Sequence, residues 1–380
     1  MKHAFIAAVP MCLGSVAFGQ IVVDGTADAD YGAPVAVQLN HTGFGNATDG
    51  GANGNCNGSE LDAAFAKIVG GVADGYLHLV LAGNLESNFN KIDIFFDTRG
   101  GAGQAELRNN NPDLDFNNLN SMGYCVDANG APDPALPGMK FDAGFAADAV
   151  IFATLGGGNA GATPPVASTM YVNFGQLLTD GGGVGGYVGN STFDSATGVH
   201  TLAPNGYGIE MALNNSNVGG VSGDSTAPGT GDGVTTGLEI KIPLLAIDWD
   251  GTSPIKVCAF VNGGDHGYLS NQVLGNLPIG AGNLGGDGNG GYLGGSCSKV
   301  RIDFASIPGD QFFVIGGGSG PNPCPADLDG DGFVTGADLG GLLGAWGACA
   351  SPCAADLDGD GFVTGADLGA MLGAWGACPN

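Results

Sequence analysis

Two acidic runs near the C-terminus have the spacing of calcium-binding loops. With Asp327 as loop position 1, carboxylates follow at positions 3, 5 and 12, and a glycine at position 6 allows a sharp turn. Calcium prefers roughly six to eight oxygen ligands, so position 7 offers a backbone carbonyl and position 9 a hydroxyl, directly or through water. The predicted ligands of two calcium ions are Asp327, Asp329, Asp331, Phe333, Thr335 and Asp338 in the first loop, and Asp356, Asp358, Asp360, Phe362, Thr364 and Asp367 in the second.

The two loops belong to a 26-residue unit that occurs twice, at 324–349 and 353–378, with three differences between the copies. Strings of Asp and Gly also occur in ordinary solvated turns. Two copies in tandem, each with an Asp at position 12 and an amphipathic run behind it, favour calcium binding over that alternative.

A short amphipathic helix is predicted after each loop. Apolar residues at i, i+3, i+4 and i+7 form one stripe, which is expected to pack on its counterpart as a small core. The stripe is Leu339, Leu342, Leu343 and Trp346 in the first copy, and Leu368, Met371, Leu372 and Trp375 in the second. The opposite face carries Gly and Ala and no charge. Because glycine costs a helix about 1 kcal/mol relative to Ala, we interpret this smooth face as a surface on which a partner docks.

The tandem unit resembles a type I dockerin, in the Gly- and Cys-containing form found at the C-terminus of secreted bacterial proteins. Both copies lack an entering helix and carry a valine, Val334 or Val363, at loop position 8. The resemblance implies docking on a cohesin-like protein or a cell-surface scaffold. Where many dockerins have basic residues, this chain has Leu343–Gly344 and Leu372–Gly373. The expected docking residues, from the resemblance and the smooth face together, are Gly336, Ala337, Gly340, Gly344, Gly365, Ala366, Gly369 and Gly373.

The first 19 residues are predicted to be a cleavable signal peptide. Lys2 precedes an apolar run, and the small residues Ala17 and Gly19 stand before Gln20. A membrane anchor is the alternative, but the run is short and contains Pro10. The mature protein is therefore expected to be secreted, with no membrane span.

Eight cysteines remain after Cys12 leaves with the signal peptide, an even number that favours disulfides in a secreted protein. Zinc is the alternative, but the spacings are not paired Cys-x-x-Cys. Within one repeat, the helix separates its two cysteines by roughly 15–18 Å, whereas a disulfide needs Cα atoms within about 7 Å. We therefore expect Cys349–Cys353 and Cys324–Cys378. The pairing of Cys56, Cys125, Cys258 and Cys297 stays open.

A net charge of −27 argues against nucleic acid and anionic membranes as partners. Part of this charge consists of the predicted calcium ligands, and the rest is a broadly acidic surface. Plain solvation is a sufficient reason for such a surface.

Residues 20–315 are predicted to form a large antiparallel β-sandwich, followed by a Gly/Pro linker at 316–323 and the tandem unit at 324–380. Apolar or alternating runs recur between Gly-, Asn- and Asp-rich turns, whereas helix signals are few. The predicted strands lie at 21–23, 76–83, 91–97, 148–155, 170–174, 238–244, 256–261 and 311–315.

The same region resembles the secreted sandwich domains related to family 9 carbohydrate-binding modules. The resemblance rests on VVDGTADADYG at the start, YLHLVLAGNL and KIDIFFDTR in the middle, and GLEIKIPLLAI near the end. It implies a link to polysaccharide binding. Such modules hold sugars between aromatic rings, and this region has Trp249 as its one tryptophan. Tyr268 and Tyr292 are alternative sugar-stacking residues, or ordinary rim and core residues.

Catalytic motifs are scarce in this chain. No G-x-S-x-G elbow or H-E-x-x-H occurs, and the mature histidines are scattered. A third calcium site at Asp113, Asp115 and Asn117 is an alternative that lacks the turn glycine. The sequence therefore favours a non-catalytic secreted protein with a calcium-dependent docking unit, associated with polysaccharide. The alternative is a polysaccharide-acting glycoside hydrolase whose acids meet only in the fold.

Overall fold

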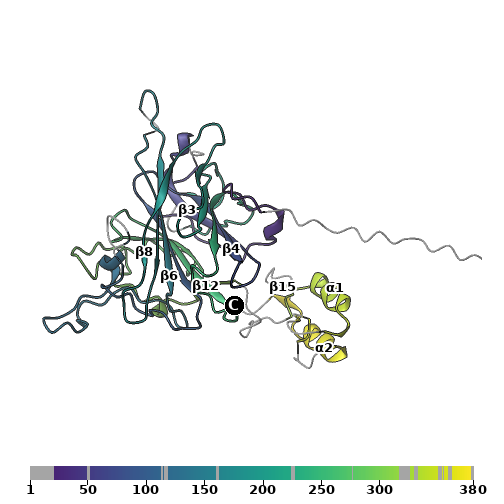
Figure 1. Cartoon of the computed structure of the whole chain (residues 1–380). Coiled ribbons are helices and arrows are strands. Elements are labelled where there is room, and N and C mark those ends of the chain that lie inside the picture. The colour runs from purple at the N-terminus through teal and green to yellow at the C-terminus, as the bar shows by residue number, and fades with distance from the viewer. Residues whose placement is uncertain are drawn as a thin grey trace, which may run out of the picture.

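The computed structural model describes residues 21–48, 52–112, 114, 119–159, 162–223, 227–275, 277–315, 326–328, 333–349, 353, 355–357 and 362–377. Over these residues the chain is mainly β, with antiparallel sheets and two short α-helices (Figure 1). The mainly β prediction is therefore confirmed. The signal peptide at 1–19, the linker at 316–323 and the alternative calcium ligands Asp113, Asp115 and Asn117 lie outside the described residues.

The first large sheet has the strand order β1-β3-β4-β11-β10-β9, with β2 paired to β3. Its strands are β1 (Ala36–Val37), β2 (Phe44–Asn46), β3 (Asn57–Val69), β4 (Tyr76–Asn84), β9 (His200–Leu202), β10 (Glu210–Leu213) and β11 (Gly237–Pro243). Short 3-10 turns lie at Ala29–Tyr31 and Ala52–Gly54.

The second large sheet has the order β13-β12-β5-β6-β7-β8, with β14 paired to β12. Its strands are β5 (Lys91–Asp97), β6 (Ala149–Gly156), β7 (Thr169–Gln176), β8 (Gly185–Thr192), β12 (Ile255–Asn262), β13 (Leu269–Leu274) and β14 (Phe313–Ile315). Further 3-10 turns lie at Leu119–Met122 and Phe304–Ser306.

The two sheets share one hydrophobic core. Alternate residues of β4 and β11 meet alternate residues of β5, β6 and β12 in a single buried cluster, because side chains on a strand point to opposite faces in turn. Members of this cluster include Leu79, Leu81, Ile94, Ile151, Phe174, Ile240 and Val257. Each fully buried side chain of this size contributes about 1.5–3 kcal/mol of hydrophobic stabilisation.

Loops also cover part of the outer face of each sheet. Phe95, Phe152 and Phe260 of the second sheet pack under the long connections before β6 and after β13. Phe65 and Val80 of the first sheet pack under the N-terminal segment. Several strands are therefore buried on both faces, as in β5, where every residue is buried.

Most predicted strands are present, but two predictions differ from the structure. Residues 21–23 are not a strand, and β3, the longest strand described at 13 residues, was not predicted. The run ELDAAFAKIV within β3 consists largely of residues that favour helices. Pairing with both β1 and β4 and burial on both faces override that preference.

The C-terminal tandem unit contains helices α1 (Gly336–Gly344) and α2 (Gly365–Gly373) and four two-residue strands. These are β15 (Phe333–Val334), β16 (Gly347–Ala348), β17 (Phe362–Val363) and β18 (Gly376–Ala377). In the described part of the chain, no helix is long and apolar enough to cross a membrane.

Candidate functional site

The tandem unit has two equivalent halves around one small core. Strand β15 of the first loop pairs with β18, which follows α2, and β17 of the second loop pairs with β16, which follows α1. Each of the two small sheets therefore contains one strand from each half. The buried core consists of Ala326, Val334 and Leu342 from the first half and Ala355, Val363 and Met371 from the second.

Each helix begins inside its predicted calcium loop, with the carboxylate of position 12 in the first turn. Asp338 Oδ1 accepts a hydrogen bond from Leu328 N at 2.7 Å, and its Oδ2 accepts one from Thr335 N at 2.7 Å. Thr335 Oγ1 in turn accepts one from Ala337 N at 3.2 Å, which completes a capping box. Asp338 thus ties loop position 2 to loop position 9 and is 1% exposed.

The second loop repeats this arrangement. Asp367 accepts hydrogen bonds from Leu357 N and Thr364 N, each at 2.7 Å, and is fully buried. A carboxylate oxygen has about two acceptor positions, so one that binds a backbone N–H can still contact a cation. Each position-12 carboxylate is therefore fixed between loop positions 2 and 9 of its own repeat.

The structure describes part of each predicted calcium-ligand set. Asp329, Asp331, Asp358 and Asp360, together with the turn glycines Gly332 and Gly361, lie outside the described residues. Among the residues that are described, no three His, Cys, Asp or Glu side chains gather in a metal-binding group. The described members of the two sets are Asp327, Thr335, Asp338, Asp356, Thr364, Asp367 and the backbones of Phe333 and Phe362.

The predicted docking residues lie on the exposed side of the two helices. Gly336, Ala337, Gly340 and Gly344 of α1 are exposed, and so are their counterparts Gly365, Ala366, Gly369 and Gly373 of α2. A Cβ added at any of these six glycines would meet no atom of the described residues within 4 Å. These helix surfaces are therefore open and uncharged.

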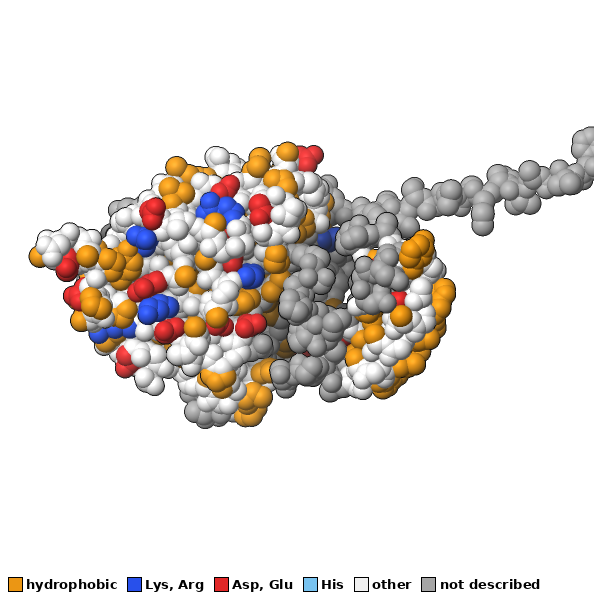
Figure 2. All heavy atoms as spheres, turned by 90° about the horizontal axis from the view of Figure 1, so that it is seen from below, with side chains coloured by type: hydrophobic (Ala, Val, Ile, Leu, Met, Phe, Trp, Pro, Cys, Tyr) orange, Lys and Arg blue, Asp and Glu red, His pale blue; other side chains and the backbone are white. Residues whose placement is uncertain are grey.

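The apolar stripe does not form a core along its whole length, which corrects the sequence interpretation. Leu342 and Met371 are fully buried, but Leu343, Trp346, Leu372 and Trp375 are 50–53% exposed. Leu343 is turned about 100° around the helix from Leu342, and Trp346 follows the end of α1. A core of two short helices cannot cover so wide a stripe. Figure 2 shows hydrophobic side chains along the outer surface of the part formed by α1 and α2.

Disulfides tie two parts of the chain. Cys349 joins Cys353 with a Cα–Cα distance of 5.9 Å, as expected across the short connection between the repeats. Cys125 joins Cys297 across the loops outside the second sheet, with a Cα–Cα distance of 5.4 Å. Cys56 and Cys258 are buried thiols, and burial raises the pKa of Cys258. Cys324 and Cys378 lie outside the described residues.

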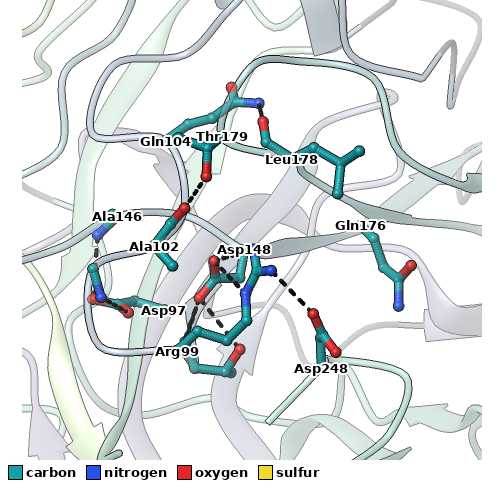
Figure 3. A network of polar contacts seen from close by, with 12 residues as sticks. Asp97, Arg99, Ala102, Gln104, Ala146, Asp148, Gln176, Leu178, Thr179 and Asp248 are labelled. Carbon is teal, nitrogen blue, oxygen red and sulfur yellow. Dashed lines mark hydrogen bonds and ion pairs between the residues drawn. The ribbon is translucent and has the colours of Figure 1, made fainter. Parts of the chain in front are cut away.

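A polar network fastens one end of the second sheet (Figure 3). Arg99 donates to Asp148 Oδ1 through Nε at 3.0 Å and Nη2 at 2.7 Å, and its Nη1 lies 3.1 Å from Asp248. Asp148 Oδ2 accepts hydrogen bonds from the backbone N of Thr98 and Arg99. Because both oxygens of Asp148 accept hydrogen bonds, the network holds the chain after β5 in place.

Two histidines form buried pairs that sequence spacing did not reveal. His200 Nε2 lies 3.0 Å from Ser168 Oγ, and His266 Nδ1 lies 3.2 Å from Asp93 Oδ2. All four residues are fully buried. His200 has no carboxylate among its hydrogen-bond partners or the groups that shift its pKa, so the Ser–His pair lacks the acid of a catalytic triad.

The aromatic residues considered for sugar stacking have different surroundings. Trp249 packs against the core and donates Nε1–H to Ser253 O at 2.7 Å, so its role is structural. Tyr268 stacks on Phe44 with ring centroids 5.9 Å apart. Tyr292 is 61% exposed and donates its hydroxyl to Asp265 at 2.7 Å. Tyr292 is therefore the one of these three rings that is largely exposed.

Comparison of the chain with models of protein families, with curated proteins and with solved structures finds no match.

Proposed function

We propose that this is a secreted, non-catalytic protein whose tandem unit binds two calcium ions and docks on a cohesin-like protein or scaffold. The observation that carries the proposal is the matched position of Asp338 and Asp367. Each carboxylate closes its own loop from position 2 to position 9, and each lies at the start of a helix with an open, uncharged outer face.

The docking face of this proposal combines small and large apolar residues. The exposed glycines let a partner backbone approach closely, and the exposed Trp346 and Trp375 supply broad apolar contact area. Since the two halves are equivalent, either half presents the same set. Aromatic anchors surrounded by small residues are typical of the energetic centres of protein interfaces.

The calcium part is tested by measuring bound metal in the full-length protein after dialysis against buffered free calcium. Two equivalents are expected to be lost when Asp327, Asp338, Asp356 and Asp367 are all replaced by Ala. Calcium bound in the same amount before and after these replacements would contradict the loop assignment.

The docking part is tested by calcium-dependent binding to a panel of purified cohesin modules. Gly344→Trp together with Gly373→Trp should abolish binding while calcium content stays unchanged, because a Trp at either position projects into the proposed interface. Gly71→Ala, at an exposed turn of the two-sheet region, is the control. Binding that survives the double change would refute the proposed face.

The link to polysaccharide is proposed through Tyr292, whose ring is exposed beside the Asp265 carboxylate. An exposed ring next to a fixed hydrogen-bonding group is a common arrangement for holding a sugar face. A glycan array with the full-length protein and with Tyr292→Ala tests this. Cleavage of any glycan on the array would support a hydrolase in place of a binding protein.

A further inference from the structure

Two buried carboxyl groups lie together at a β-bulge of the first sheet. In the pairing of β3 with β4, Glu60 is opposite Asn84 and Leu61 is opposite Gly83, but Ala63 is opposite Ala82. Asp62 is therefore the extra residue of a bulge, a distortion that re-aims a side chain. Both Glu60 and Asp62 are fully buried.

The surroundings of these carboxyl groups are unusually rich in oxygen. Asn84 Nδ2 lies 2.8 Å from Ala47 O, 2.9 Å from Asn217 O and 3.3 Å from Glu60 Oε1. Asn217 Nδ2 lies 2.8 Å from Glu60 Oε1, 3.0 Å from Asp62 Oδ2 and 3.0 Å from Gly219 O. Each amide nitrogen carries two hydrogens and faces three oxygens.

Two buried oxygens in this cluster, Glu60 Oε2 and Asn84 Oδ1, accept no hydrogen bond from an N–H or O–H group of the described residues. The carboxyl groups of Glu60 and Asp62 are themselves within hydrogen-bond reach of each other, as two carboxyl groups can be when they share a proton or a cation. A buried acceptor without a partner is costly, about 1–3 kcal/mol each in proteins. Since Glu60 is fully buried and Asn84 is 1% exposed, bulk water cannot donate hydrogen bonds to these two oxygens.

Among the residues that the structure describes, no cationic side chain forms an ion pair with Glu60 or Asp62. Burial raises the pKa of both groups, and the charge of Asp62 raises that of Glu60 further. The pair must therefore hold protons or a cation.

We infer that Glu60, Asp62, Asn84 and Asn217 form a binding site for a calcium ion, separate from the two C-terminal loops. Two carboxylates balance the charge of a divalent ion, and the backbone oxygens of Ala47, Asn217 and Gly219 add neutral ligands of the kind that calcium takes. The two orientations of an Asn amide are nearly equivalent in shape. A half-turn of the Asn84 amide about its Cβ–Cγ bond places its Oδ1 among these oxygens.

The loop that carries Asn217 lies between the site and a surface pocket. The pocket has a volume of about 490 Å³ and is lined by residues 216–220 and 232–236, among them Asn217. Gly220 has a positive φ of 82°, and a Cβ there would collide with Asp62 Oδ1. The backbone of this loop thus covers the carboxylates directly, and Val221 N donates to Asp62 at 2.8 Å.

The test is calcium bound by the full-length chain after dialysis against buffered free calcium, in a loop variant with Asp327, Asp338, Asp356 and Asp367 all changed to Ala. One equivalent should remain, because the inferred site does not depend on the loops. Adding Glu60→Gln and Asp62→Asn should remove it, whereas adding Glu239→Gln, another buried carboxyl group of the same sheet, should not.

Asn217→Ala is a milder variant in case the double change prevents folding, since this residue is only partly buried. It should weaken binding of the remaining ion by about tenfold or more. A loop variant that binds no calcium would overturn the inference and leave a pair of carboxyl groups that share protons. Calcium retained after Glu60→Gln and Asp62→Asn would overturn it as well.

Discussion

The hydroxyl of Tyr31 donates a 2.6 Å hydrogen bond to Glu239, a residue 208 positions further along the chain. The other carboxylate oxygen of Glu239 accepts hydrogen bonds from Asp24 N and Gly25 N at 2.8 and 2.9 Å. The N-terminal segment is thereby fastened to β11 at the centre of the first sheet. Burial raises the pKa of Glu239, and burial together with Glu239 raises the pKa of Tyr31.

Tyr31→Phe should lower the free energy of unfolding by about 1–3 kcal/mol, because it removes a hydrogen bond to a buried charged acceptor. Urea unfolding of the full-length protein measures this. Tyr292→Phe is the matched control, since its ring is 61% exposed, and it should change stability by less than about 0.5 kcal/mol. Equal losses in the two variants would show that the Tyr31 contact is not a fastening point.

Arg99→Met should destabilise the protein by about 2–4 kcal/mol, because it leaves the fully buried Asp148 without its charged partner. Arg108→Met is the comparison, since Arg108 pairs at 3.7 Å with an almost fully exposed Asp180. That exposed pair should contribute at most about 1 kcal/mol. Chemical denaturation of both variants gives the difference, and a loss of less than 1 kcal/mol for Arg99→Met would contradict the role of the network.

His200 should make the wild-type protein lose stability in mild acid. Burial lowers the pKa of His200 below its ordinary value of 6.5, so the unfolded chain binds a proton there more readily than the folded chain. The stability that the neutral, buried imidazole of His200 contributes is fully present above about pH 6.5. It is lost as the pH falls from there toward the lower pKa of the folded state. Between about pH 7.5 and 5.5, the wild type should therefore lose more stability than His200→Gln does. Parallel stability curves for the two proteins would rule this out.

The same added methyl group should have opposite effects at two glycines of the tandem unit. Gly340 lies inside α1 with open space around it, so Gly340→Ala should stabilise the helix by about 0.8–1 kcal/mol. Gly347 has a φ of 113°, which an L-residue rarely adopts, so Gly347→Ala should destabilise the adjoining strand pair. Hydrogen exchange of peptides covering 333–349 measures both. Changes of the same sign would contradict the local backbone assignment.

Strands with alternating or continuous apolar runs were predictable from the sequence. β4, β5 and β12 all lie within a residue or two of the predicted ranges, because burial against the other sheet selects β-branched and aromatic residues at those positions. β3 was not predictable, since its local preference is helical and only its neighbours in space make it a strand.

The inferred site at Glu60 could not be found from spacing. Its members are Glu60 and Asp62 on β3, Asn84 on β4, and Asn217 in a loop more than a hundred residues away. The sequence near Asp62 contains no residue pattern that predicts a β-bulge. The predicted calcium loops of the tandem unit are different in this respect. All the residues of one loop lie within a single short segment, so their spacing in the sequence is enough to predict the site.

The exchange of strands between the halves of the tandem unit has a consequence for its folding. β15 pairs with β18 and β17 with β16, so neither repeat closes its own hydrogen-bond ladder. A chain cut after the first copy would leave Val334 and Leu342 facing solvent with no sheet partner. We therefore expect the two copies to fold together, and a core substitution in either copy to destabilise both.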